Sequence, residues 1–201
     1  MNLISIFITA LISENIILTK FLGICSFLGT SNKEKNAIGM GLSTTFVIII
    51  STIITYLINK YILIPTNSEY LQTITFILVI ACFVQITEII IKRYFKDLYK
   101  SLGIYLPLIT TNCAVFGIIL TNISMKYDLI TSLVYSLASS LGYIIVIYTF
   151  SLMREKIENN DIIKPLKGIP IALIIAGIMA IIFGRLSWFL IYFLHYLWLL
   201  Q

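Results

Sequence analysis

Long apolar stretches separated by short polar segments make up most of this chain. Four of them, at residues 44–58, 74–84, 132–153 and 169–184, contain no charged side chain. A helix that crosses a bilayer needs roughly 20 predominantly apolar residues. The pattern predicts an all-α integral membrane protein with six transmembrane helices, at 3–27, 37–59, 70–91, 102–123, 129–152 and 168–190.

Composition supports this prediction, because 59% of the residues are hydrophobic and only 11% are charged, whereas about a quarter are charged in ordinary soluble domains. The net charge of +5 lies in short groups between apolar runs, which argues against a nucleic-acid surface. Residues 1–9 contain no Lys or Arg. The first span therefore lacks the basic start of a signal peptide, and we expect it to remain in the mature protein.

Positive residues indicate how the spans are oriented. The connections after the first, third and fifth spans carry ten Lys and Arg residues, whereas the opposite side carries three. Positive loops face the cytoplasm, so both termini should lie outside. The ten are Lys33, Lys35, Lys92, Arg93, Lys96, Lys100, Arg154, Lys156, Lys164 and Lys167, and the three are Lys60, Lys126 and Arg185.

A short motif occurs twice. Cys25 begins a Cys-x-x-x-Gly motif in the first span, and Cys113 begins another in the fourth. An odd number of spans per repeat inverts the second copy, which predicts two inverted three-helix repeats, at about 3–91 and 102–190, within one membrane domain. Gly23 and Pro107 lie close to the motifs and disrupt regular helices. We therefore expect the first and fourth helices to be broken, and an aromatic tail to occupy 186–201.

The two motif cysteines have two interpretations. Free cysteine often packs as a small apolar residue. Alternatively, the thiolates of Cys25 and Cys113 meet and supply half of the ligands of a metal centre, since a [2Fe–2S] cluster takes four cysteine sulfurs. The third cysteine, Cys82, has no glycine motif and is interpreted as a packing residue.

Glu14 lies near the middle of the first span, where an ionisable group is costly and indicates function. We consider it a candidate for an ion path, with a structural hydrogen bond as the alternative. Lys20 is six residues away, on a different face of a regular helix. The two could approach only through a break or by contact with other helices. His195 is interpreted as an interfacial side chain, and Glu88 and Lys92 as an ordinary helix pair.

The motifs resemble those of a known family, the small membrane subunits of the Rnf electron-transport complex and of the sodium-translocating NADH:quinone reductase. The similarity covers about residues 3–184 and is carried by the segments at 21–29 and 103–117, with further matches at 69–73, 154–156 and 168–177. The Rnf branch fits the second segment best. The resemblance implies a subunit of a redox-driven ion translocase in the bacterial inner membrane that is not catalytic alone.

The same resemblance implies the cofactor and the partners. Cys25 and Cys113 would ligate a [2Fe–2S] cluster shared with the homologous subunit RnfE, within a complex that also contains RnfB, RnfC, RnfD and RnfG. Electrons would pass between ferredoxin and NAD, coupled to Na⁺ or H⁺ movement. Two alternatives stay open at this point, a quinone-reductase subunit of the NqrE type and a stand-alone secondary transporter built from inverted repeats.

The topology can be tested with reporter fusions. Fusions after Lys96 and Lys164 should report the cytoplasm and a fusion near Lys126 the outside, because positive loops are retained inside. The reverse pattern would contradict the orientation.

Overall fold

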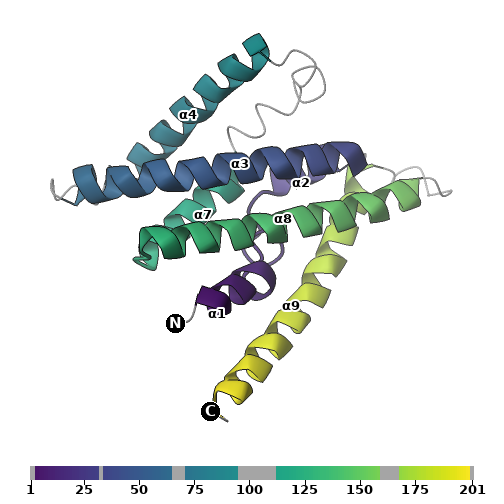
Figure 1. The fold of residues 1–201 in the computed structure, drawn as a ribbon. Helices are drawn as coiled ribbons and strands as arrows, with labels where there is room; N and C mark the ends of the chain where they lie inside the picture. The colour runs from purple at the N-terminus through teal and green to yellow at the C-terminus, as the bar shows by residue number, and fades with distance from the viewer. Residues whose placement is uncertain (1–2, 32–33, 65–70, 95–111, 159–167, 200–201) are drawn as a thin grey trace.

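The computed structural model describes residues 3–31, 34–64, 71–94, 112–158 and 168–199. Within these ranges the secondary structure is entirely helical (Figure 1). The elements are α1 (Leu3–Ile8), the π-helical turn η1 (Thr9–Ser13), α2 (Ile24–Thr30), α3 (Glu34–Ile58), the π-helical turn η2 (Asn59–Leu63), α4 (Gln72–Tyr94), α7 (Cys113–Ser124), α8 (Leu129–Glu158) and α9 (Ile169–Leu199).

Two continuous helices, Glu34–Leu63 and Leu129–Ile157, are long and apolar enough to cross a membrane. Shorter apolar helices occupy Leu3–Ser13, Thr73–Ile86, Cys113–Ser124 and Ile169–Arg185. Each of the six predicted spans thus overlaps helix in the described residues, although residues 102–111 of the fourth lie outside them. The helix α9 continues to Leu199, so the aromatic segment extends the last helix. The inverted relation of the two halves stays a prediction.

The helices α3 and α8 lie side by side at the centre, with α4 on the α3 side and α1 and α9 on the α8 side (Figure 1). Small hydroxyl residues line their buried faces, and these residues let membrane helices approach closely. Large apolar side chains instead cover the outside, as at Ile130 and Ile181. A polar interior and an apolar exterior suit a protein surrounded by lipid. The buried hydroxyls include Thr44, Ser51, Thr52, Thr55, Ser132, Ser136, Ser139 and Ser140.

The first predicted span is interrupted, as expected, between Ser13 and Ile24. Asn15, which is 2% exposed, holds this break. Its Nδ2 donates to the carbonyl of Gly142 on α8 (3.0 Å), and its Oδ1 accepts from the Ile17 N–H (3.2 Å). A Cβ at position 142 would lie only 2.7 Å from the backbone oxygen of Leu11. Glycine at 142 therefore lets the broken span approach α8.

The second half of the span, α2, is fixed against α8 at its far end. The rings of Phe27 and Phe150 stack with centroids 4.0 Å apart. Arg154 is 6% exposed, and its guanidinium donates to the Leu28 carbonyl (2.8 Å) and to Ser31 Oγ (3.1 Å). Helix C-termini leave carbonyls without partners and attract cations. Arg154 thus satisfies the end of the half-helix that carries Cys25.

Candidate functional site at the broken helix

The structure brings the two cysteine motifs together. The backbone N–H of Gly23 donates to the Sγ of Cys113 at 2.9 Å, across 90 residues of sequence. Gly23 has a φ of +87°, and a Cβ there would lie 3.1 Å from the Cβ of Ala114 and 3.2 Å from the Tyr143 ring. Glycine is needed at this position both for its left-handed backbone and for this close approach.

A buried hydrogen-bond network lies directly behind the motifs. Ser26 Oγ donates to the carbonyl of Gly23 (2.9 Å), so the Tyr143 hydroxyl donates to Ser26 (2.8 Å). The amide of Asn112 also donates to Ser26 Oγ (3.3 Å), while its Oδ1 accepts from the Ala114 N–H (3.0 Å) and caps α7. One hydroxyl thus links the loop before α2 to the start of α7 and to α8.

Both motif cysteines lie in the first turn of a helix. Cys113 is the first residue of α7 and is partly exposed, whereas Cys25 is the second residue of α2 and is exposed. The positive end of the α7 dipole favours a thiolate at Cys113. Within the described residues, no group of three or more His, Cys, Asp or Glu side chains could hold a metal. Cys82, on α4, is exposed, so it lies at the surface of the described chain and outside its core.

Glu14 and Lys20 meet across the break. The Nζ of Lys20 lies 3.5 Å from Glu14 Oε2 and donates to Thr121 Oγ1 on α7 (3.3 Å). Glu14 Oε2 also accepts from the Tyr135 hydroxyl on α8 (3.2 Å). The two charges could not meet on one regular helix, and the interruption between Ser13 and Ile24 is what allows their contact.

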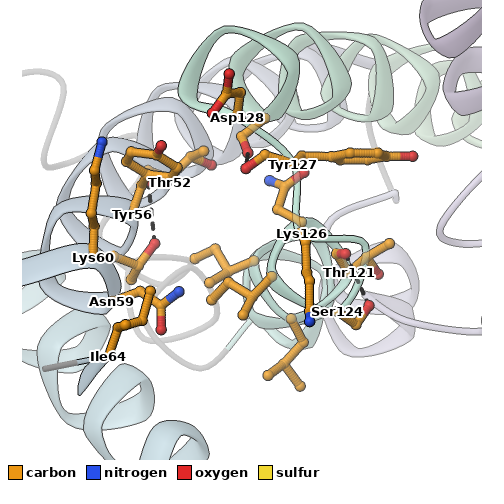
Figure 2. Close-up of a pocket in the computed structure, with 16 residues that line it drawn as sticks. Thr52, Tyr56, Asn59, Lys60, Ile64, Thr121, Ser124, Lys126, Tyr127 and Asp128 are labelled. Atoms are coloured by element: carbon orange, nitrogen blue, oxygen red, sulfur yellow. Dashed lines mark hydrogen bonds between the residues drawn. The ribbon is translucent and has the colours of Figure 1, made fainter. Parts of the chain in front are cut away.

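A polar pocket of about 830 Å³ lies on the other side of Thr121, between α3, η2 and the turn from α7 to α8 (Figure 2). Burial, followed by the negative charge of Glu14, raises the pKa of Tyr127 above 10.0, its usual value. Because Tyr127 also lines the pocket, Glu14 acts electrostatically on one of its walls. A shallower hollow lies on α9, lined by Arg185, Trp188, Phe189 and Tyr192.

The sequence analysis identified Cys25, Cys113 and Glu14 but did not assign roles to Asn15, Tyr143, Tyr135 or Arg154. Each of these four binds a group more than 100 residues away, so no local pattern indicates it. The only available signal was the presence of polar residues in apolar runs. The side chains of Glu88, Lys92 and His195 lie outside what the structure describes.

Known proteins match nearly the whole chain. A family model described as Rnf-Nqr subunit, membrane protein, matches residues 3–190. A protein of Shewanella sp. (strain ANA-3) is 46% identical over 88% of this chain and 92% of its own length. A protein of Psychromonas ingrahamii is 47% identical over 89% and 93%. Both carry the name of the A-type component of an ion-translocating oxidoreductase complex.

The contact between Gly23 and Cys113 can be tested by thiol labelling in a Cys82→Ser background. Gly23→Ala should separate the motifs, because its Cβ meets Ala114 and Tyr143. Maleimide labelling of Cys113 should then rise roughly fivefold, the factor that matches one hydrogen bond of about 1 kcal/mol. Cys25 is already exposed and is the internal reference. An unchanged Cys113 rate would contradict the contact.

Proposed function

The chain belongs to the Rnf-Nqr family of membrane subunits, and from this premise we propose that it is the A-type membrane component of an ion-translocating oxidoreductase complex. The names of its relatives support this assignment, since they match about nine-tenths of both chains. An apolar exterior around a polar interior supports a place in the membrane. The proposed setting is the bacterial inner membrane, with both termini outside.

Within that complex, the proposed role of Cys25 and Cys113 is to ligate half of a [2Fe–2S] cluster. The carrying observation is the Gly23–Cys113 hydrogen bond, which brings the first motif to the sulfur of the second. The donor set fits, because two sulfurs at the surface of one chain leave room for two from a homologous RnfE-type subunit. When bound, the cluster would supply one-electron transfer.

The chain's own residues prepare this site. The N–H of Gly23 donates to a sulfur and so stabilises negative charge there, and the α7 N-terminus does the same. Tyr143, Ser26 and Asn112 hold the two motif loops in register. The chain thereby positions two ligands and is not catalytic alone. RnfB, RnfC, RnfD, RnfE and RnfG are the proposed partners that supply and accept electrons.

Cysteine replacement in the purified complex tests this role. Cys25→Ser and Cys113→Ser should each abolish one [2Fe–2S] signal in electron paramagnetic resonance and lower the iron content, because a hydroxyl is a poor substitute for a soft thiolate ligand. Cys82→Ser is the control, and its signal should persist. A lost signal in Cys82→Ser together with a retained one in Cys113→Ser would contradict the assignment.

Glu14 is proposed to take part in coupling electron transfer to the movement of Na⁺ or H⁺. It is the acid that the break places next to Lys20, Tyr135 and the polar pocket. An ionisable group within the membrane commonly marks an ion path.

Glu14→Gln in the reconstituted complex should lower ion transport more than electron transfer, because it removes the charge and keeps the size of the side chain. Glu34→Gln is a matched control, since Glu34 also accepts from a tyrosine hydroxyl, that of Tyr148 (2.9 Å). Equal loss of both activities with poor assembly would indicate a structural role for Glu14.

A further inference from the structure

The pocket between α3 and the turn from α7 to α8 has an uncharged base and a charged rim. Its base contains Thr52 and Thr55 on α3, Asn122 on α7 and Ser132 on α8, of which none is more than 5% exposed. Lys60, Lys126 and Asp128, by contrast, are exposed. Buried neutral oxygens therefore decide what binds at the base, while solvent and salt screen the rim.

The hydroxyls at the base have no hydrogen left to donate to a ligand. Thr52 Oγ1 donates to the Ile48 carbonyl (2.8 Å) and Thr55 Oγ1 to the Ser51 carbonyl (2.6 Å). Ser132 Oγ donates to the carbonyl of Tyr127 (3.4 Å). Since a hydroxyl has one hydrogen and two lone pairs, each of these groups presents only acceptor capacity to the pocket.

A directed chain of hydrogen bonds orients the Asn122 amide. Because Thr52 donates to its own helix, Ser136 Oγ must be the donor in its 2.9 Å contact with Thr52. The Nδ2 of Asn122 in turn donates to Ser136 Oγ (2.9 Å). The amide oxygen of Asn122 is thus left as the acceptor end of the chain. This oxygen is buried, and among the described residues it has no hydrogen-bond partner.

We propose that the base of this pocket binds a sodium ion. An unpaired buried carbonyl is costly, so a ligand that stabilises it must carry a hydrogen or a positive charge. Hydroxyl and amide oxygens are hard ligands, which suit an alkali cation. An anion is disfavoured at the base because the hydroxyls have no hydrogen to donate to it.

The charged rim is compatible with this site. The Nζ of Lys60 lies 5.9 Å from the centroid of the Tyr56 ring, which holds its charge by a cation–π contact. The ammonium groups of Lys60 and Lys126 lie on opposite sides of the pocket (Figure 2). Asp128, on the same rim, partly offsets their charge for an arriving cation.

The site deepens the proposed function, on which it rests for its role as a station in ion translocation. Thr121 lines the pocket and also accepts from Lys20, the partner of Glu14. One side chain therefore separates the proposed sodium site from the intramembrane ion pair. A cation at the base would bear electrostatically on Lys20 and so on Glu14.

Equilibrium binding of ²²Na⁺ to the purified, resting complex tests the proposal, with choline chloride keeping ionic strength and anion constant. The wild type should show saturable binding, and Asn122→Leu should weaken it roughly tenfold or more. Asn122→Asp keeps the size and adds a negative charge, so it should bind sodium more tightly. Thr45→Val is the control, because Thr45 makes the same bond to its own helix (2.8 Å to the Gly41 carbonyl) but does not line the pocket.

Absence of saturable sodium binding in a complex with full iron content would overturn the sodium site and leave the proposed function standing. Binding that neither Asn122→Leu nor Asn122→Asp alters would also overturn it. Failure of the proposed function would appear separately, as a complex that lacks the cluster or does not transfer electrons. Sodium binding is measured at rest, so the two results are independent.

Discussion

Backbone that is not helical within a membrane must find hydrogen-bond partners inside the protein, and the interruption of the first span imposes that demand on the rest of the structure. Asn15 meets part of it by joining the break to Gly142 on α8 and by accepting from Ile17. The Gly23 N–H meets another part through the sulfur of Cys113. The same contact satisfies a backbone group and brings the cysteine motifs together.

Several features of the fold follow from holding this break in place. Gly142 and Gly23 allow close approach where a side chain would collide. Arg154 satisfies the end of α2, and Asn112 caps the start of α7. The hydroxyl-lined faces of α3 and α8 bring these helices close enough to support both ends of the broken span. The candidate site and the polar pocket therefore belong to one architecture, joined through Thr121, Lys20 and Glu14.

The sequence predicted the apolar helices, the break near Gly23 and the two cysteines because each has a local signature. Apolar length indicates a span, and a repeated Cys-x-x-x-Gly motif stands out from its surroundings. The meeting of Glu14 with Lys20 was foreseen only as one consequence of a break. Tyr143 and Arg154 could not be predicted, because their partners Ser26 and Leu28 are 117 and 126 residues distant. Helix ends were also less predictable, and α9 continues to Leu199 because its aromatic residues extend the apolar run.

The central claim is that the interrupted first span brings Cys25 close to Cys113 within one chain. Spin labels on both cysteines, in a Cys82→Ser background, test it most directly. The frozen-state spectrum of the doubly labelled chain should show dipolar broadening that is missing from chains labelled singly after Cys25→Ser or Cys113→Ser. A spectrum equal to the sum of the two singly labelled spectra would contradict the account.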